Sequence, residues 1–360
     1  MLLIQEKLRA GCSLEELSKT HGLNLCYHKS LPLVIINYDQ IESKKTDKLA
    51  CECRGLILEL GSWDIVARSF NRFFNYGEMI EEQKDFDWSN FSTLEKVDGS
   101  LMLLWNYQGN WYVSTRGSFS DQNPNGAPNT WEEMFWSVFN KEHLRHLSQN
   151  NTYVFEFVSP FTKIVRDYRK IDLYLLTVIK YNGDEYNVNC LKSQAALINT
   201  NCPASYNFSS PQEILDWLDK NGNEDPTFEG FVTKDINGMR VKLKGKCYVS
   251  LHKLRGNNNI FSYKYLIPFM FDGELDELLV YFPECKDIAF ELKSKVDNLI
   301  NEAMVVWNSA KNEEYQKNFA LAIKGRTPLG SVLFEARKSG VCPSLLFKNY
   351  QDLFLKILKE

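Results

Sequence analysis

One lysine stands where a nucleophile would be useful. Lys96 lies at the entry of an apolar run that begins at Leu101, two residues before the turn signal Asp98-Gly99. A lysine that loses its proton can act as a nucleophile and form covalent intermediates. An exposed turn can also carry Lys and Asp-Gly without any chemical role, so this stretch by itself leaves both interpretations open.

Two carboxylates further along the chain stand where an apolar core would not accept them. Strand alternation in Val154–Val158 places Glu156 between apolar neighbours on one face. Glu229 precedes Gly230, and a glycine in a strand lets a ligand or another backbone approach closely. A buried carboxylate needs a cation, a metal or hydroxyl donors. Glu229 therefore suits Mg²⁺ bound to a nucleotide phosphate, whereas a buried salt bridge is the alternative explanation for Glu156.

Two lysines follow the second carboxylate. Lys242 and Lys244 alternate with the apolar residues Val241 and Leu243, so on a strand both lysines share one face with Arg240. Such a pair can clamp a phosphate, or it can protect the solvent-facing edge of a sheet. Three arginines of the same β-rich part stand beside a glycine or an aromatic residue, namely Arg54, Arg72 and Arg116.

The composition favours a globular protein with more than one domain. The chain has 360 residues, enough for two or three domains at about 150 residues each, and 23 Phe, 17 Tyr and 8 Trp to build their cores. The net charge of −4 does not indicate a nucleic-acid binder, but residues 234–264 contain eight Lys or Arg and one acid. Such a local stripe can bind phosphate, or it can be a solvated face.

The cysteines and the apolar runs bear on the compartment. The nine cysteines are an odd number without zinc spacing, which predicts a reducing, cytosol-like compartment. The first residues lack the pattern of a secretory signal, and no run approaches the ~18 apolar residues of a membrane span. We therefore expect a cytoplasmic protein without membrane association.

The candidate site residues lie in a part of the chain that is predicted to be rich in β-strands. Alternating apolar runs predict an antiparallel β-rich part, with strands at 31–38, 152–158 and 171–181 and hairpins at 101–116 and 228–244. Helices are predicted at 130–147 and 212–220, and two short ones within 1–30, the second opened by Ser13 with Glu16 in capping-box spacing.

The pattern changes after about residue 259. Strand alternation ends there, and five helices are predicted, at 276–282, 287–307, 313–324, 328–338 with Thr327 as N-cap, and 344–358. The predicted fold class is therefore α+β, with a domain of residues 1–258 followed by an all-helical C-terminal domain of residues 259–360.

The order of the motifs is informative beyond each motif alone. Arg54-Gly55, Lys96-x-Asp98-Gly99, Glu156, Glu229-Gly230 and Lys242-x-Lys244 together resemble the ordered motifs of covalent nucleotidyltransferases, the superfamily of ATP-dependent polynucleotide ligases and RNA capping enzymes. The finer resemblance is to the bacteriophage RNA ligase 1 family. It rests on Glu52-Cys53-Arg54-Gly55, Phe73-Phe74-Asn75, Arg116-Gly117-Ser118, Phe155-Glu156-Phe157-Val158 and Tyr248-Val249-Ser250-Leu251-His252, and it covers roughly residues 30–280.

The resemblance implies an antiparallel-sheet nucleotidyltransferase (ligase adenylation) domain and a role for each matching residue. Lys96 would attack the α-phosphorus of ATP and form a lysyl-AMP, while Lys242 and Lys244 would neutralise the α-phosphate. Arg54 and Glu156 would lie near the ribose. The remaining implied assignments are adenine near the backbone of Glu95, the outer phosphates or the RNA end at Arg72 and Arg116, a metal at Glu229, and a second metal at Asp276 and Glu277.

Three positions depart from the family pattern. The family usually has lysine where Arg72 and Arg116 stand; arginine keeps the charge and adds a bidentate fork, which changes the geometry of a phosphate contact. Ile36 stands where the family can show a tyrosine near the phosphates.

The resemblance agrees with the physical chemistry of the residues. A lysine with its free pKa of about 10.4 is protonated at neutral pH and cannot attack. Nearby cations such as Lys242 and Lys244, together with a bound metal, favour its neutral amine. The charge on a transferring phosphoryl group needs neutralisation, which a lysine pair and Mg²⁺ or Mn²⁺ supply.

The sequence therefore predicts an ATP-dependent RNA ligase that joins 5′-phosphate and 3′-hydroxyl RNA ends through a lysyl-AMP and an AMP-capped RNA. The resembling family suggests repair of nicked tRNA, action as a monomer, and the host cytosol if the protein is viral. A DNA ligase or a capping-type nucleotidyltransferase is the alternative, disfavoured because no OB-type β pattern follows Lys244. A non-catalytic RNA-binding protein is a further alternative, disfavoured because Lys96 and the carboxylates and lysines that support it are all present.

Overall fold

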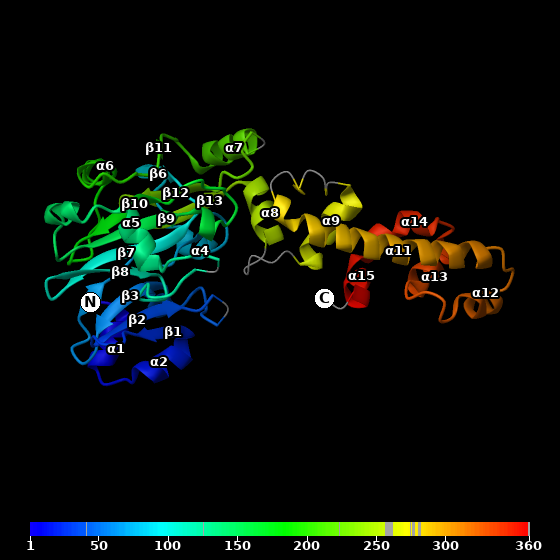
Figure 1. Cartoon of the computed structure of the whole chain (residues 1–360), viewed down its shortest axis with the longest axis horizontal. Coiled ribbons are helices and arrows are strands. Elements are labelled where there is room, and N and C mark those ends of the chain that lie inside the picture. Colours follow the sequence, from blue (N-terminus) through cyan, green and yellow to red (C-terminus); the bar gives the residue numbers. More distant parts are fainter. Residues whose placement is uncertain are drawn as a thin grey trace. The chain divides into compact units, whose positions relative to one another are not determined.

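The structure is a computed structural model, and it describes residues 1–40, 42–124, 126–222, 224–255, 262–273, 275, 278–279 and 282–358. The chain divides into two compact units, Met1–Val249 and Ser250–Glu360, whose elements are labelled in Figure 1. The boundary predicted at residue 258 lies outside the described residues and stays a prediction. Asp276 and Glu277, predicted to hold a second metal, also lie outside them.

Three sheets form the framework of the first unit. The first has the order β1-β2-β3-β4, the second β10-β9-β7-β8, and the third β11-β6-β12-β13-β5. Their bounds are β1 Leu23–Tyr27, β2 Leu33–Tyr38, β3 Arg54–Glu59, β4 Ile65–Ala67, β5 Phe74–Asn75, β6 Phe91–Glu95, β7 Ser100–Tyr107, β8 Asn110–Thr115, β9 Thr152–Val158, β10 Asp172–Ile179, β11 Ser205–Tyr206, β12 Gly230–Asp235 and β13 Arg240–Lys244.

The predicted antiparallel sheets are present, with one difference. All strand pairs are antiparallel except β13 with β5, which run parallel through Val241 opposite Phe74 and Lys242 opposite Asn75. The short β5 brings the predicted Phe73-Phe74-Asn75 motif directly beside the strand that carries the lysine pair. Neither β5 nor this pairing was predicted, since a parallel partner leaves no turn signal in the sequence.

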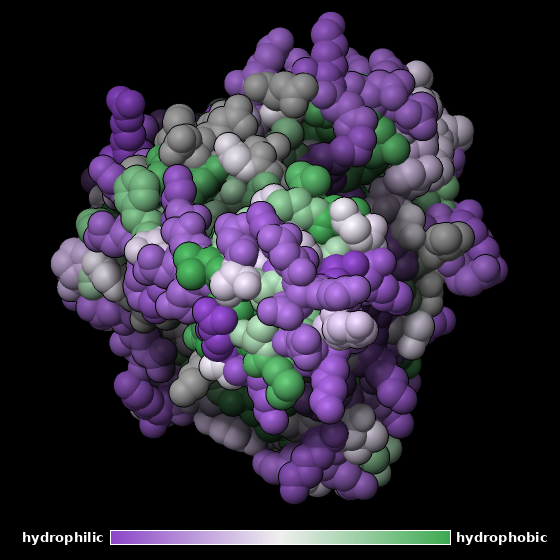
Figure 2. All heavy atoms as spheres, turned by 90° about the vertical axis from the view of Figure 1, so that its right-hand side faces the viewer, coloured by the Kyte–Doolittle hydropathy of each residue, from purple (hydrophilic) through white to green (hydrophobic). Residues whose placement is uncertain are grey.

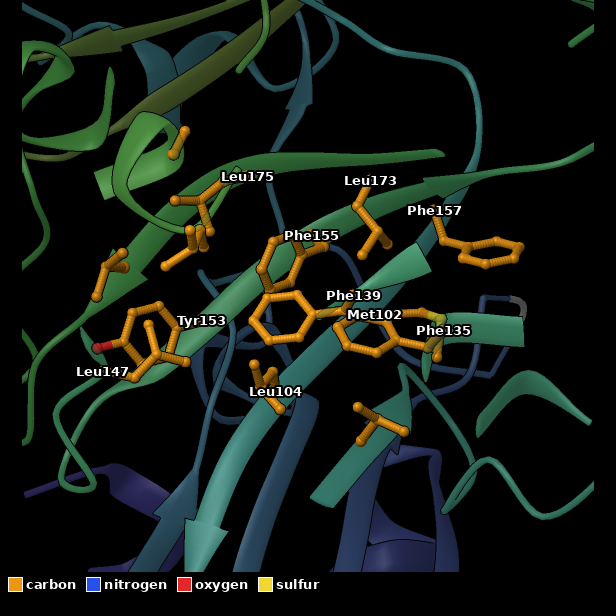
Figure 3. Close-up of a cluster of buried hydrophobic side chains, with 14 of the residues drawn as sticks. Met102, Leu104, Phe135, Phe139, Leu147, Tyr153, Phe155, Phe157, Leu173 and Leu175 are labelled. Atoms are coloured by element: carbon orange, nitrogen blue, oxygen red, sulfur yellow. The ribbon is translucent and has the colours of Figure 1, made fainter. Parts of the chain in front are cut away.

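The apolar run of β7 shows how the sequence builds two cores at once. Side chains on a strand alternate between its faces. Leu101 and Leu103 therefore join Ile35 of β2 in a core between the first and second sheets, while Met102 and Leu104 turn to the opposite face. Figure 3 shows this second core, where Phe135 and Phe139 pack over Phe155 and the neighbouring side chains of β9 and β10.

Helices cover the outer faces of the sheets in the first unit. Their bounds are α1 Leu3–Arg9, α2 Leu14–His21, α3 Lys48–Glu52, α4 Ile80–Gln83, α5 Trp131–Val138, α6 Val188–Leu197 and α7 Pro211–Asn221. The α1 and α2 pair was predicted, and the side chain of Ser13 accepts the N–H of Glu16 as expected for an N-cap. α3 and α6 were not predicted, nor was β1, an edge strand with one buried residue and hence a weak alternation.

The helix predicted at 130–147 is two elements instead of one. α5 ends before Phe139, whose backbone is extended with ψ 113°, and a 3-10 helix then spans Lys141–His146. Phe139 is 2% exposed and stacks on Phe135. The apolar residues of both segments pack into the same core, which explains the periodicity that suggested one continuous helix. The helix ends at Phe139 because its side chain is buried in that core.

The second unit is helical throughout its described part. Its elements include α9 Tyr263–Asp272, α11 Lys286–Ala310, α12 Gln316–Ile323, α13 Gly330–Ser339, α14 Pro343–Leu346 and α15 Gln351–Leu358, with 3-10 helices at Pro283–Cys285 and Phe347–Tyr350. α8 (Lys246–Arg255) begins in the first unit and ends in the second. α8 and α9 were not predicted, and α9 contains Pro268, a residue that is unfavourable inside a helix.

Two helix boundaries of the second unit differ from the prediction. α13 begins at Gly330, and Thr327 instead accepts the N–H of Leu329 in a turn at 3.2 Å. The helix predicted at 344–358 is divided into α14, a 3-10 segment and α15. Figure 2, a view from the side on which Figure 1 labels α12, shows mainly hydrophilic side chains with scattered apolar ones. Among the described helices, none combines the length and the apolar character that crossing a membrane requires.

Candidate active site

Lys96 lies directly after β6, and a carboxylate holds its amine. The Lys96 Nζ is 2.8 Å from Oε1 of Glu229, and the Lys244 Nζ is 2.8 Å from the same oxygen. The Glu229 side chain is only 4% exposed, whereas the two lysines keep about a quarter of their surface, 22% and 23%. One buried carboxylate thus pairs with two amines at the edge of the sheet.

Strand register brings these three residues together. β12 lies between β6 and β13, with Phe231 opposite Glu95 and Gly230 opposite Lys244. The backbone N–H of Lys96 continues this pairing, since it donates to the carbonyl of Gly230 at 2.8 Å. The residue after β6, the residue before β12 and the last residue of β13 therefore meet at one end of the third sheet.

Gly230 is required at this junction for two reasons. Its φ is +135°, a conformation that residues with a side chain rarely adopt, and a Cβ there would lie 2.1 Å from the carbonyl oxygen of Leu243. Glycine therefore allows β12 and β13 to approach so closely that Glu229 reaches Lys244. The sequence-based expectation of a close backbone approach at this glycine is confirmed.

The alternation of β13 separates the lysines from the core. Val241 and Leu243 are buried together with Ile214 and Leu218 of α7. Lys242 and Lys244 therefore extend from the opposite face of the strand, the face that carries the site. β5 pairs with β13 at Val241 and Lys242, so Lys242 does not lie on a free sheet edge, and Lys244 contacts the buried Glu229 instead of solvent alone.

Glu156 enters the site from the second sheet. It lies on β9, opposite Leu101 of β7 and Tyr174 of β10. Gly99 permits the contact between this strand and the loop that follows Lys96, because a Cβ at Gly99 would lie 2.5 Å from the carbonyl oxygen of Phe157. Burial raises the pKa of Glu156 to about 7, against the opposing effect of the Lys96 and Arg54 cations.

The charges of the site are strongly coupled. Burial alone would lower the pKa of Lys96, but the Glu229 and Glu156 carboxylates outweigh burial and raise it. Burial likewise opposes ionisation of Glu229, yet the Lys96 and Lys244 amines hold its pKa below the ordinary value. Burial, together with the Lys244 and Lys96 cations, lowers the pKa of Lys242 to about 8. Lys96 is thus an ammonium ion in the protein without its substrate.

The predicted arginines lie on aromatic rings near this charge cluster. The Arg54 guanidinium lies 4.5 Å from the ring centre of Phe70, and it also approaches Phe73 at 5.9 Å. Arg72 and Arg116 lie 4.2 Å and 5.5 Å from the ring of Tyr38. Tyr38 therefore gathers two cations from distant segments, a feature that the sequence did not reveal.

Glu95 is oriented away from the lysine cluster. Its Oε1 lies 3.6 Å from Arg166, which also approaches Asp225 at 3.5 Å. Burial raises the pKa of Glu95, and the Arg166 cation partly offsets this effect. The backbone N–H of Glu95 donates to the carbonyl of Ala204 at 2.8 Å. The predicted role of the Glu95 backbone beside adenine stays a prediction.

Asp98 and Tyr248 form a support that the sequence analysis did not assign. Asp98 is 4% exposed and accepts the backbone N–H groups of Val165 and Arg166 at 2.9 Å and 2.8 Å. Its second oxygen accepts the Tyr248 hydroxyl at 2.8 Å. The sequence placed Asp98 in a turn signal and in the Lys96-x-Asp98-Gly99 motif but indicated no role of its own, because its partners are 67 to 150 residues away in sequence.

The donor set of the site fits a metal that shares its ligands with a nucleotide. No group of three or more His, Cys, Asp or Glu side chains suited to a metal occurs among the residues that the structure describes. Glu229 supplies one buried carboxylate, and Mg²⁺ is commonly held by one or two carboxylates together with substrate phosphates. Glu229 is therefore the residue that would hold the metal. The lysines can neutralise a phosphate, and Glu229 can hold a divalent cation. The amine of Lys96 can then be presented to that phosphate.

Comparisons with known proteins agree with this chemistry. A family model described as RNA ligase matches residues 52–266. A protein of Autographa californica nuclear polyhedrosis virus, named for polynucleotide kinase and RNA ligase activities, is 26% identical over 84% of this chain and 45% of its own length. An RNA ligase of Rhodothermus phage RM378 is 23% identical over 75% of this chain and 77% of its own length. The chain thus spans less than half of the first relative.

Among solved structures, an archaeal ATP-dependent RNA ligase has the same fold. It matches with a TM-score of 0.50 and 13% identity, over 91% of this chain and 80% of the archaeal chain. At this identity the likeness concerns the fold, and the roles of individual residues have to come from the geometry of the site.

Proposed function

The chain belongs to the phage-type RNA ligase 1 family, since the family model covers residues 52–266, and from this membership we propose that the protein is an ATP-dependent RNA ligase. The membership confirms the resemblance predicted from the motifs. The observation that carries the proposal is the position of the Lys96 amine, 2.8 Å from the buried carboxylate of Glu229 and beside Lys244.

The first proposed displacement uses Lys96 as the nucleophile. Its neutral amine attacks the α-phosphorus of ATP, so that a P–N bond to AMP forms while the bond to pyrophosphate breaks. The proton of the Lys96 ammonium has to leave before the attack, and the loss of the Glu229 partner lowers the cost of that step. Glu229 would hold Mg²⁺ or Mn²⁺, which would supply neutralisation of the phosphate charge.

The surrounding residues take the roles that their places support. Lys242 and Lys244 neutralise the α-phosphate, since both lie on the site face of β13. Arg54 and Glu156, whose charges interact, bind the ribose. The remaining assignments follow the family resemblance: adenine at the backbone of Glu95, the outer phosphates or the RNA end at Arg72 and Arg116, and a second metal at Asp276 and Glu277, which lie outside the described residues.

Two further displacements complete the reaction. A 5′-phosphate of RNA attacks the phosphorus of the lysyl-AMP, which restores the lysine and leaves an AMP-capped RNA. The 3′-hydroxyl of a second RNA end then attacks the capped 5′-phosphate, a phosphodiester bond forms, and AMP leaves. Lys96 serves the first two steps directly, whereas the third relies on the cations that neutralise the phosphates.

The helical character of the second unit supports an RNA ligase over a DNA ligase or a capping enzyme. Its described residues form helices and contain no strand, so they include no OB-type β domain. We therefore keep the layout of an adenylation domain followed by an all-helical domain. Nicked tRNA as the substrate, action as a monomer and a cytosolic location are finer proposals, the last supported by nine cysteines without a disulfide.

Incubation of the full chain with α-labelled ATP and Mg²⁺ tests the proposal. We expect one covalent label per chain, absent from Lys96→Ala and present at the normal level in the control variant Lys192→Ala, which alters an exposed lysine of α6. Transfer of the label to 5′-phosphorylated RNA in preference to DNA then identifies the acceptor of AMP. The mechanism is wrong if no label appears, or if Lys96→Ala still acquires it.

A further inference from the structure

A cavity of about 760 Å³ lies beside the lysine cluster, where segments of all three sheets meet. Three segments line it: residues 68–74 between β4 and β5, residues 179–185 after β10, and residues 234–240 at the tip of the β12–β13 hairpin. Apart from Arg72 and the adjoining phenylalanines, none of the motif residues lines this cavity. The residues assigned to adenine, the ribose and the α-phosphate therefore lie outside the lining of this cavity.

The acids of the cavity are already engaged by partners. Glu185 accepts Arg240 at 2.7 Å and the Thr177 hydroxyl at 2.7 Å, and it lies 3.5 Å from Lys234. Burial alone would raise the pKa of Glu185, but the Arg240 and Lys234 cations lower it to about 2, so the carboxylate is ionised. One carboxylate thus stands against two cations, which leaves the cluster with a net positive charge.

The whole lining carries five cations and three carboxylates, because Arg68, Arg72 and Lys180 stand against Asp184 and Asp235. Asp235 uses both carboxylate oxygens on backbone N–H groups, those of Asp87 at 3.1 Å and Met239 at 2.8 Å. Arg68 and Lys180 also line the cavity, and no carboxylate of a described residue lies within ion-pair distance of either. The Arg68 guanidinium donates to the side-chain oxygen of Asn71 at 3.1 Å, and the exposed Lys180 amine lies 5.8 Å from the ring centre of Tyr186. Neither charge is neutralised by a close ion pair, so both attract an anionic ligand.

Aromatic rings form the wall between the cavity and the active site. Phe70 lies between two guanidinium groups, with Arg54 of the active site and Arg240 of the cavity each 4.5 Å from its ring centre. Phe73 lines the cavity and also lies 5.5 Å from the Lys242 amine. Cations combined with aromatic rings are the usual surface for single-stranded nucleic acid, since the rings stack on bases and the cations follow the backbone.

The strand β13 leads from the cavity to the nucleophile. Arg240, Lys242 and Lys244 share one face, so successive cations are about 6.6 Å apart along the strand. The first lines the cavity and the last touches the carboxylate that holds Lys96. A phosphate chain that extends away from the reacting end would follow this row into the cavity.

We propose that this cavity binds the single-stranded RNA segment adjoining one of the ends to be joined. The inference rests on the proposed function and adds the path of the substrate. Arg68 and Lys180 contact backbone phosphates, and the partly exposed rings of Phe73 and Phe74 receive bases. The 5′-phosphorylated strand and the 3′-hydroxyl strand share this chemistry, and the experiment distinguishes them.

The test uses the full chain and the double variant Lys180→Glu/Asn237→Glu. Both residues are exposed on the rim of the cavity, so their replacement leaves the core intact. Lys220→Glu is the matched control, since Lys220 is exposed on α7, the helix that packs against the opposite face of β13. Ligation is measured with donor and acceptor strands of about 2 and about 10 nucleotides, each varied in turn.

We expect the double variant to raise KM about tenfold for the long form of one strand, with little change for its short form. The strand that responds, donor or acceptor, identifies the occupant of the cavity. The slope of log KM against log salt should fall by about 0.7 for each phosphate that the variant no longer binds, which a purely structural effect would not produce. Lys220→Glu should leave all of these values near those of the unmodified protein.

Three outcomes would overturn the inference. The double variant could change KM no more than Lys220→Glu does, or it could affect short and long strands equally. It could also weaken self-adenylation by ATP as strongly as ligation, which would assign the cavity to the nucleotide. Failure of the proposed function is distinct, since the unmodified chain would then acquire no label from ATP at all.

Discussion

The carboxylate of Glu229 lies 2.8 Å from the amine of Lys96, the group that we propose as the nucleophile. This pairing keeps Lys96 protonated in the protein without substrate, because the carboxylates of Glu229 and Glu156 outweigh the effect of burial on its pKa. A divalent cation bound at Glu229 would replace the amine as the partner of that carboxylate. The pairing thus restrains the proposed nucleophile in the free protein, and without it the neutral amine of Lys96 would be easier to form.

Replacement of Glu229 should affect both stability and adenylation. In Glu229→Gln, two amines lose the carboxylate that they share, and we expect a loss of about 2 kcal/mol in the free energy of unfolding, since unpaired charges in a buried site are costly. Self-adenylation should fall about a hundredfold or more. Urea unfolding and label incorporation measure the two effects. The exposed Glu224→Gln provides the control, and equal behaviour of the two variants would contradict the assignment.

Two glycines of one hairpin allow a matched test of the strand junction. A Cβ at Gly230 would lie 2.1 Å from the Leu243 carbonyl oxygen, whereas at Gly238, with φ +86°, it would meet nothing within 4 Å. We expect Gly238→Ala to cost about 1 kcal/mol, since only backbone strain is added. Gly230→Ala should cost more than about 2 kcal/mol and displace Glu229, so that adenylation is lost as well. If both variants lost the same amount of stability and adenylation, the close approach of Gly230 to the Leu243 carbonyl would be unimportant.

The binding of ATP should depend on the charge of Lys242. Burial and the neighbouring cations lower the pKa of this amine to about 8 in the free protein, so the ammonium is lost as pH rises through that value. The kcat/KM for self-adenylation reports groups of the free protein, and the contribution of Lys242 to it should decline above pH 8. Lys242→Arg keeps its charge and should remove this part of the decline. If Lys242→Arg and the unmodified protein had the same pH profile of kcat/KM, the proposed contact of Lys242 with a phosphate would be wrong.

Glu185 should contribute to stability only above acidic pH. Its pKa is lowered to about 2 from 4.5 by the Arg240 and Lys234 cations, which outweigh burial. A group with a lowered pKa stabilises above its unfolded value, and the contribution is lost as pH falls towards the folded value. Glu185→Gln should therefore be less stable than the unmodified protein by up to about 3 kcal/mol at pH 6, and this difference should shrink between pH 4.5 and pH 2. Thermal unfolding of both proteins between pH 2 and pH 6 measures this difference. A stability difference that does not change with pH would contradict the pairing of Glu185 with Arg240 and Lys234.

Local patterns in the sequence predicted most elements that surround the site. Alternation in β7, β9 and β13 and the glycine after Glu229 were sufficient, because strand side chains alternate with a fixed period and glycine marks close backbone approaches. β6, the strand that ends before Lys96, was not predicted. The family resemblance likewise depended on motif order alone, and the family model confirms it. Each of these signals is contained in a few neighbouring residues.

Other features were beyond the sequence because they join distant segments. The pairing of β13 with β5, the ring of Tyr38 beneath Arg72 and Arg116, and the contact of Tyr248 with Asp98 leave no periodic trace. The same holds for the break after α5, where burial of Phe139 decides where the helix ends.

The sequence by itself determined which groups can do chemistry: a lysine, two carboxylates and a lysine pair in a fixed order. Only the tertiary structure decided that Glu229 holds Lys96 and Lys244 together, and that a cationic, aromatic-walled cavity lies at the far end of the same strand. The physical reason is that residue types and their spacing define strands and reactive groups locally. Charge pairing and burial, which set the pKa values of the site, depend on the register between strands that are distant in the chain.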